Sequence, residues 1–116
     1  MDEILITIIT FIFIGFLFIL LGIPLLLEKV KPNWFLGFRT PTTVKNKTLW
    51  YKVNMQVGRE FIIAGIVVIV GSIFMLIFQP ILTLILVIII LLLLVHASII
   101  LIIIRGFLSV KKLKSQ

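Results

Sequence analysis

Three long apolar runs restrict what this chain can fold into. They cover about residues 4–27, 61–78 and 81–104. A helix rises about 1.5 Å per residue, so the first and third runs would each reach about 36 Å and cross a hydrocarbon core of about 30 Å with some tilt. The middle run, at about 27 Å, only just spans that core. The sequence therefore predicts an all-α integral membrane protein with three transmembrane helices.

The composition agrees with this class. Of the 116 residues, 62% are hydrophobic and 13% are charged, whereas soluble domains have about 25% charged residues. We expect one membrane domain over residues 1–116, with a cytoplasmic interfacial loop over residues 28–60. The chain has no cysteine, which excludes disulfides, thiolate metal ligands and a cysteine nucleophile.

Two features bear on how the spans begin and are separated. Proline has no N–H for a continuous helix, so we expect a tight hairpin turn at Gln79–Pro80. The first run resembles a signal peptide only in its position. Asp2 and Glu3 stand where a basic region would be, and no small-residue cleavage site follows. We therefore expect the first run to remain as a transmembrane span.

The charges predict the topology. All eleven Lys and Arg residues lie either between the first two runs or after the third, while Asp2 and Glu3 precede the first. By the positive-inside rule the N-terminus is then outside and the C-terminus is in the cytoplasm. Cytoplasmic charge beside anionic lipid also explains the net charge of +7, so nucleic acid is not an expected partner.

Small residues at seven-residue spacing predict contacts between the spans. Gly58, Gly65 and Ser72 share one face of the second span, and Gly15 and Gly22 share one face of the first. In lipid, where no hydrophobic force joins helices, small residues let two backbones approach closely. We interpret both stripes as packing surfaces rather than as a ligand passage.

His96 is the one ionisable side chain well inside a span. We place it about 13 Å from the cytoplasmic end of the third span, near the depth of Gly22 and Gly65, and expect His96 and Ser98 to face that small-residue layer. An ionisable group inside the membrane is a functional-site hypothesis by default. The alternative, which we favour, is a neutral histidine hydrogen-bonded between helices, because no Asp, Glu or Lys lies at that depth.

The connection between the first two spans is too long for an idle link. It contains Trp34, Trp50 and Tyr51, of the types that gather at the headgroup level. Thr40-Pro41 is typical of a helix start, because threonine can cap free N–H groups and proline suits the first helical position. We predict an interfacial amphipathic helix over about 43–57, continuous or nearly so with the second span.

Arg39 lies between an aromatic residue, Phe38, and the turn at Thr40-Pro41, rather than on a solvated charged face. A guanidinium group can bind a phosphate or carboxylate through two parallel hydrogen bonds, or hold a loop by binding backbone carbonyls. The sequence leaves both roles open.

The segment KPNWFLGFRTPTTVKNKTLWYKVNMQVGREFIIAGIVVIVG resembles the signature of the SdpI family, small bacterial membrane proteins named for an immunity protein against a sporulation-delaying peptide toxin. The family pattern is Asn, then Gly-x-Arg-Thr, a Trp eleven residues after the Arg, and Asn and Gly at four-residue steps. This chain supplies Asn33, Gly37, Arg39, Thr40, Trp50, Asn54 and Gly58 in that order. The resemblance makes Asn33, Gly37, Arg39, Thr40, Trp50 and Asn54 candidates for binding a partner or lipid.

The resemblance implies a multi-pass protein of the bacterial cell membrane that protects against a membrane-active peptide toxin or relays its presence to a cytoplasmic regulator. In the type member, the protein also holds a transcriptional repressor at the membrane when toxin is present. The implied partners are membrane lipids, a hydrophobic peptide toxin and a cytoplasmic regulator. Assembly as a homo-oligomer is also compatible with the sequence.

Other functions have less support. An accessory subunit or lipid-binding scaffold of a membrane complex fits the charge pattern, and a small oligomeric transporter is less favoured because one intramembrane histidine makes a poor pathway. We expect no enzyme, since the four carboxylates are divided between the two sides of the predicted membrane and no catalytic motif is present. No cofactor or metal is expected either.

Overall fold

The computed structural model describes residues 2–78 and 83–114, and these residues form four helices and no strand. The helices are α1 (Glu3–Leu26), α2 (Pro41–Lys45), α3 (Lys47–Ile77) and α4 (Leu84–Lys114). Three of them, α1, α3 and α4, are long and apolar enough to cross a membrane. The predicted all-α architecture with three spans is therefore confirmed. The predicted turn at Gln79–Pro80, and residues 81–82 of the predicted third span, lie outside the described residues.

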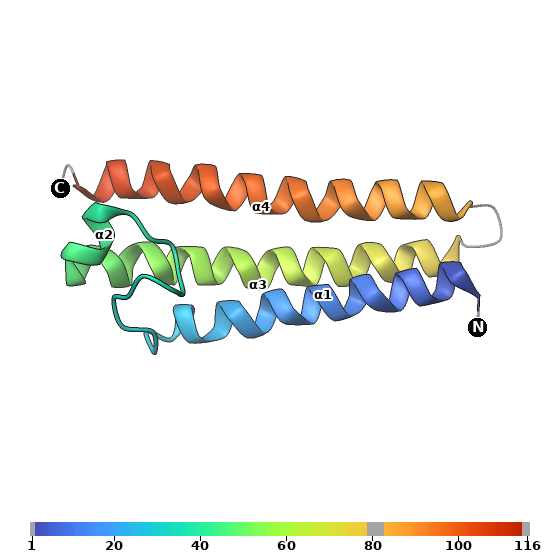
Figure 1. Cartoon of the computed structure of the whole chain (residues 1–116), viewed down its shortest axis with the longest axis horizontal. Helices are drawn as coiled ribbons and strands as arrows, with labels where there is room; N and C mark the ends of the chain where they lie inside the picture. Colours follow the sequence, from blue (N-terminus) through green and yellow to red (C-terminus); the bar gives the residue numbers. More distant parts are fainter. Residues whose placement is uncertain (1, 79–82, 115–116) are drawn as a thin grey trace.

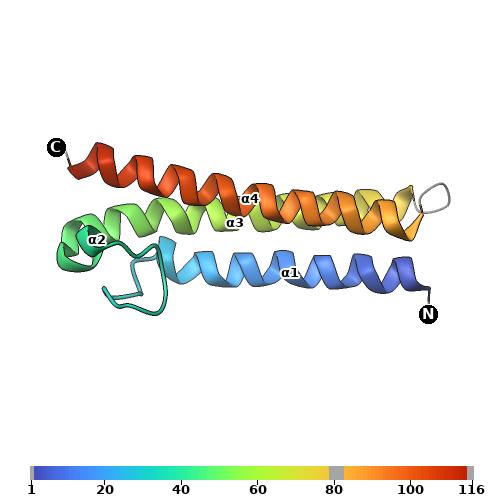
Figure 2. The same ribbon diagram turned by 45° about the horizontal axis from the view of Figure 1, so that its top comes forward.

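The three long helices run side by side and alternate in direction, with α3 next to both α1 and α4 (Figures 1 and 2). The helix α1 packs more extensively on α3 than α4 does. The N-terminus lies near the C-terminal end of α3 (Figure 1). The long loop, α2 and the C-terminal end of α4 lie together at the other end of the bundle (Figure 1).

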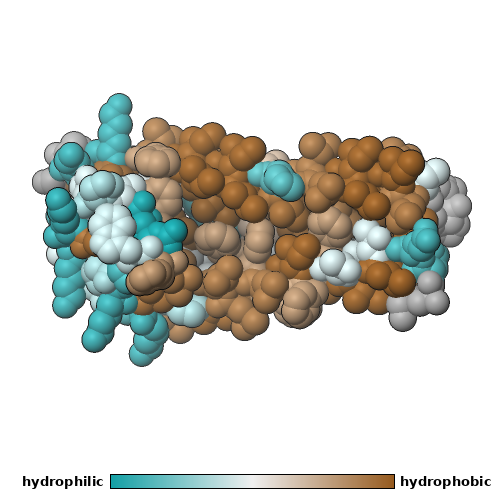
Figure 3. Space-filling model, viewed as in Figure 1, coloured by the Kyte–Doolittle hydropathy of each residue, from teal (hydrophilic) through white to brown (hydrophobic). Residues whose placement is uncertain are grey.

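The bundle is longer than a bilayer core is thick. It extends 52 Å along its longest axis, and a hydrocarbon core measures about 30 Å. Figure 3 shows a broad hydrophobic band, with hydrophilic side chains gathered at the end that carries α2 and the C-terminal end of α4. The predicted third span ends at 104, but α4 continues to Lys114. The extra length of α3 and α4 thus forms a helix pair beyond the band.

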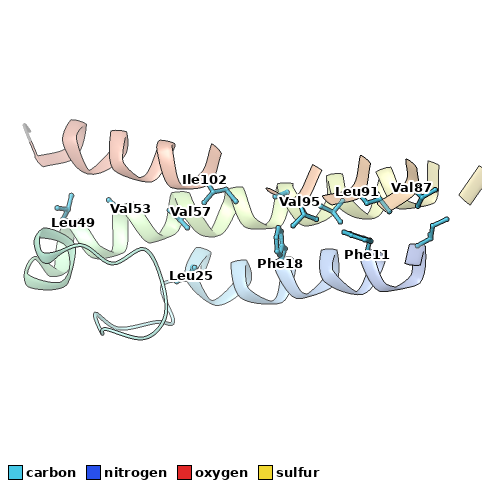
Figure 4. Packing of buried hydrophobic residues seen from close by; sticks show 13 residues of the cluster. Phe11, Phe18, Leu25, Leu49, Val53, Val57, Val87, Leu91, Val95 and Ile102 are labelled. Atoms are coloured by element: carbon cyan, nitrogen blue, oxygen red, sulfur yellow. The ribbon is translucent and has the colours of Figure 1, made fainter. Parts of the chain in front are cut away.

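Buried apolar side chains line the contact between the long helices (Figure 4). Phe11 and Phe18 come from α1, and Val87 and Leu91 come from α4. The ring of Phe18 meets that of Phe61 edge-on, with 5.5 Å between the ring centroids. Many other large apolar side chains are exposed on the outside of the bundle, which is the arrangement expected of a surface that faces acyl chains.

Two glycine pairs bring the backbones of α1 and α3 into contact. A β carbon built on Gly65 would lie 2.5 Å from the carbonyl oxygen of Gly15, and one on Gly58 would lie 2.6 Å from that of Gly22. Ser72, the third member of the α3 stripe, is buried and donates its hydroxyl to a carbonyl one turn earlier. The structure thus places both predicted glycine stripes in one contact between antiparallel helices.

The predicted helix over about 43–57 is not a single element. Asn46 has an extended backbone (φ −119°, ψ 104°), which ends α2 at Lys45 and starts α3 at Lys47. Its side-chain oxygen accepts a hydrogen bond from the Leu49 N–H at 3.1 Å. An asparagine that caps a helix in this way competes with helical conformation at its own position, and this is the physical reason for the break.

From Lys47 onward the helix continues into the second span, as predicted. The apolar stripe that makes the predicted helix amphipathic, Val53, Val57 and Phe61, does not have the membrane-facing environment expected of an interfacial helix. Val53 and Val57 are fully or almost fully buried within the core cluster instead of lying on a membrane surface. The protein's own loop and α4 cover this part of α3.

Candidate functional site

The loop between α1 and α3 crosses one end of the bundle (Figure 1), and Asn33 shapes its first turn. The Asn33 Oδ1 atom accepts hydrogen bonds from the N–H groups of Phe35 (2.8 Å) and Leu36 (2.7 Å), and Nδ2 donates to the Lys31 carbonyl at 2.6 Å. An asparagine side chain that bonds neighbouring backbone in this way stabilises a turn. The side-chain amide of Asn33 therefore makes its hydrogen bonds to the backbone of the loop itself.

Trp50 and Asn54, one turn apart on α3, hold the loop against the helix. Trp50 is 0% exposed and donates its indole N–H to the Val30 carbonyl at 2.8 Å. Asn54 accepts from the Phe38 N–H at 2.6 Å and donates to the Trp50 carbonyl at 3.0 Å. Trp50, of a residue type that gathers at the headgroup level, is buried inside the protein, where the Val30 carbonyl provides a partner for its N–H.

Gly37 fits between these two side chains. Its φ of +105° is a conformation that residues with a β carbon rarely adopt. A β carbon there would also lie 2.8 Å from Asn54 Oδ1 and 3.1 Å from Trp50 Cζ2. Gly37, Trp50 and Asn54 thus form one packed unit, although they come from two different segments of the chain.

Thr40 and Thr43 cap the short helix α2. The Thr40 hydroxyl accepts from the Thr43 N–H at 3.1 Å, and the Thr43 hydroxyl accepts from the Thr40 N–H at 2.8 Å. This is a reciprocal capping box, and it confirms that the helix starts after Thr40 with Pro41 in its first position. Thr43 is completely buried and was not among the residues singled out in the sequence.

Phe38 attaches the loop to α4. A β carbon on Gly106 would lie 2.7 Å from Phe38 Cδ2, so the ring rests directly on that glycine. The same ring meets Phe107 edge-on, with centroids 5.2 Å apart. Gly106 was not predicted as part of the site, because its partner, the Phe38 ring, lies far away in the sequence. A glycine inside an otherwise strong helical run was the available signal.

Arg39 differs from the other signature residues. Its side chain is exposed, and within residues 2–78 and 83–114 it makes no hydrogen bond or ion pair. A cavity of about 310 Å³ lies beside it, between the loop and the three long helices. We call this cavity the loop groove, and its walls include Phe35, Phe38 and Arg39 from the loop and Leu25, Phe61 and Ile102 from the helices. Arg39 supplies the charge in a groove that is otherwise mainly apolar.

His96 and Ser98 do not face the small-residue layer, so that expectation was wrong. The glycine pairs lie between α1 and α3, whereas His96 is exposed on α4. His96 Nδ1 lies 2.8 Å from the carbonyl of Leu92, and Ser98 donates to the carbonyl of Leu94 at 2.8 Å. Each polar group therefore finds its partner one turn earlier on its own helix.

An ion pair joins α3 to α4 at the edge of the apolar stretch. Glu60 Oε1 accepts from the Arg105 Nε–H and from Gln56 Nε2, the latter at 3.3 Å. The pair connects residues that are 45 positions apart, so no local pattern indicates it. In the part of the chain that the structure describes, no group of three or more His, Asp or Glu side chains is placed to hold a metal ion.

The family model of the SdpI/YfhL proteins matches residues 29–107. The chain belongs to the SdpI family. Searches of the curated proteins and of the solved structures found no match.

In this SdpI-family protein, the matched segment corresponds to a structural unit. It begins in the loop after α1, contains all of α3 and ends at Phe107, against which the Phe38 ring packs. The hydrogen bonds that join Trp50 and Asn54 to the loop, one donated by Trp50 and one accepted by Asn54, lie wholly within it. All of α1 lies outside the match, although α1 supplies one half of each glycine pair. The SdpI segment is thus the loop together with the two helices that hold it.

Proposed function

We propose that this SdpI-family protein is an immunity- or sensor-type membrane protein that binds a membrane-active peptide toxin at the loop groove. One observation carries the proposal. Asn33, Trp50 and Asn54 use their polar groups for hydrogen bonds within the protein, whereas the Arg39 guanidinium is exposed beside an apolar groove and has no partner among the described residues.

The chemistry of the groove fits one end of a hydrophobic peptide. A guanidinium group binds a carboxylate through two parallel hydrogen bonds, and the side chains of Phe35, Phe61 and Ile102 offer contact to apolar residues. A toxin that already lies in the bilayer gains no further hydrophobic energy there, so packing and the charged hydrogen bonds have to provide the affinity. Arg39 is therefore the residue on which recognition would depend.

The same groove offers a way to relay binding. Phe38 lines the loop groove and also rests on Gly106 of α4. A toxin in the groove would contact the residue that ties the loop to α4. Movement of that residue would alter the end of the bundle that we predict to be cytoplasmic, where a regulator would bind.

Survival of a toxin-sensitive Gram-positive strain tests the proposal. The strain would carry the wild type, Arg39→Ala, Arg39→Lys, Lys31→Ala or an empty vector, and would be exposed to several membrane-active peptides. Blots of membrane fractions would show that protein levels are equal. We expect the wild type and Lys31→Ala to protect, because Lys31 is an exposed cation of the same loop outside the groove walls. Arg39→Ala should lose protection, and Arg39→Lys should protect only in part, because lysine keeps the charge without the forked donors.

Two results would count against the proposal. Protection by Arg39→Ala equal to that of the wild type would show that the toxin does not bind at the loop groove. An absence of protection by correctly inserted wild type, across all the peptides, would instead favour an accessory subunit or lipid-binding scaffold. Proteins that co-purify with the chain would then be the next measurement.

A further inference from the structure

A second groove lies between α3 and α4, near the C-terminal end of α4, and is separate from the loop groove. It has a volume of about 650 Å³, and its walls carry Lys52 and Arg59 from α3 and Arg105 and Lys112 from α4. We call it the basic groove. On each helix the two cations are seven residues, or about 10 Å, apart.

A hydrogen bond across the middle of the basic groove fixes how the two helices face each other. Ser109 donates to Gln56 Oε1 at 2.7 Å, and the Glu60–Arg105 ion pair lies about one turn further along α3. In this antiparallel register Lys52 faces the turn of α4 that carries Lys112, and Arg59 faces Arg105. The groove therefore has a pair of cations at each end.

No Asp or Glu is among the described residues that line the basic groove. Glu60 lies next to it on α3, and its Oε1 atom is already engaged by Arg105. Lys52 and Arg59 are exposed and form no ion pair with a described residue. A groove with a surplus of positive charge selects an anionic occupant.

An apolar cavity continues the basic groove along the same contact of α3 and α4. It has a volume of about 370 Å³, and Ile63, Val67 and Leu101 are among the residues that line it. Arg105 lines both cavities. We call this second cavity the apolar slot. An acidic protein segment would use the basic groove alone, whereas a molecule with an anionic head and an apolar tail would use both.

We propose that the basic groove and the apolar slot together bind an anionic phospholipid, with its phosphate among the four cations and part of an acyl chain in the slot. Basic pockets between transmembrane helices commonly bind such headgroups. The site lies apart from Arg39, so it does not depend on the toxin proposal.

Glu60 makes the proposal more specific. Its Oε2 atom is buried and has no hydrogen-bond partner among the described residues, and Glu60 lines the slot beside Arg105. A buried acceptor of this kind requires a donor. A glycerol headgroup carries hydroxyl donors, so the site should prefer phosphatidylglycerol to phosphatidic acid, which has the phosphate without those hydroxyls.

Native mass spectrometry of the full-length protein tests this site. Detergent-solubilised protein would be titrated with phosphatidylglycerol, phosphatidic acid or phosphatidylcholine, and apparent dissociation constants compared. We expect the wild type to bind phosphatidylglycerol most tightly and phosphatidylcholine most weakly. Each basic side chain near anionic lipid contributes roughly fivefold in affinity, so K52Q/R59Q should weaken phosphatidylglycerol binding by roughly 25-fold.

The control K29Q/K31Q removes the same charge from the exposed loop, and circular dichroism would show that both double variants are folded. The control should bind phosphatidylglycerol like the wild type. Equal weakening in both double variants would overturn the proposal in favour of a diffuse charge effect. Displacement of phosphatidylglycerol by soluble glycerol phosphate or polyaspartate at similar concentrations would also overturn it, because the acyl chain would then contribute nothing. Tight phosphatidylglycerol binding that V67W weakens would support the slot.

Discussion

The ring of Phe38 rests on Gly106, so closely that a β carbon at position 106 would lie 2.7 Å from Phe38 Cδ2. This contact joins the family loop to α4, while Asn54 joins the same residue to α3 through its backbone N–H. Phe38 is thus held by both helices at once. The position of Arg39, its neighbour in sequence, follows from these two attachments.

Gly106→Ala should destabilise the protein, although alanine favours a helix over glycine by about 1 kcal/mol. The added methyl group meets an aromatic ring that has little room to move, and overpacking of this kind typically costs about 1–3 kcal/mol. Thermal unfolding in detergent, followed by circular dichroism, would measure the loss. Gly71→Ala is the matched control, because a β carbon there meets only Leu94 Cδ2, the end of a flexible side chain. The control should be neutral or stabilising, and an equal response of both variants would contradict the role of the contact.

Gly58→Ala should disrupt the packing of α1 on α3. The new β carbon would lie 2.6 Å from the Gly22 carbonyl oxygen and 2.6 Å from the Leu26 backbone nitrogen. Backbone atoms cannot turn aside as a side chain can, so the two helices have to separate and their contact is lost along its length. We expect a loss at the upper end of the range of about 1–3 kcal/mol that overpacking typically costs, by the same unfolding measurement. A variant as stable as Gly71→Ala would show that the helices can shift without cost.

Asn54→Ala should release the loop. It leaves the Phe38 N–H and the Trp50 carbonyl without the side-chain partners they have in the wild type, at a cost of about 1–3 kcal/mol. Trypsin should then cleave the detergent-solubilised protein faster after Arg39 and Lys45. Asn54→Asp keeps an oxygen acceptor for the Phe38 N–H but loses the amide donor, so its cleavage rate should be intermediate. Cleavage at the wild-type rate in Asn54→Ala would mean that Trp50 alone holds the loop.

Much of the fold follows from local sequence patterns. An apolar run has to be long enough to cross the hydrocarbon core, so its length indicates a span without knowledge of its neighbours. The glycine stripes are also visible as a local pattern, because Gly15 and Gly22 have the same seven-residue spacing as Gly58 and Gly65. The helix start at Thr40-Pro41 is also local and was recognised in the sequence, although the predicted helix was given from about residue 43 and α2 begins at Pro41.

The parts that were not predicted depend on contacts between distant segments. Glu60 and Arg105 meet across two helices, and nothing near either residue indicates the other. The direction of His96 depends on which face of α4 packs against α3, and an apolar helix with hydrophobic residues all round gives little indication of that face. The break at Asn46 is different, because its cause is local: the asparagine side chain caps α3 by accepting a hydrogen bond from the Leu49 N–H.

Glu28→Gly should stabilise the protein. The chain leaves α1 through Glu28, whose φ is +57°. The N–H of Lys29 donates to the Pro24 carbonyl at 2.9 Å, and that of Glu28 to the Leu25 carbonyl at 3.3 Å, which is a Schellman motif usually built on glycine. A non-glycine residue pays about 1–2 kcal/mol for this conformation, so we expect a gain of about 1 kcal/mol in thermal unfolding. Glu28→Ala, which changes the charge without relieving the backbone, should show no such gain.

Cysteine labelling can test the predicted orientation directly, because the chain has no cysteine of its own. Single cysteines would be placed at Asp2 and at Lys31, two exposed positions at opposite ends of α1. Since the basic residues cluster at the Lys31 end, the positive-inside rule places that end in the cytoplasm. A membrane-impermeant maleimide should therefore label Asp2→Cys in intact protoplasts and label Lys31→Cys only after the membrane is permeabilised. The unsubstituted chain controls for labelling of other groups. The opposite labelling pattern would show that the predicted topology is reversed. The loop groove, Arg39 and the basic groove would then lie on the outer side of the membrane, from which an external toxin arrives.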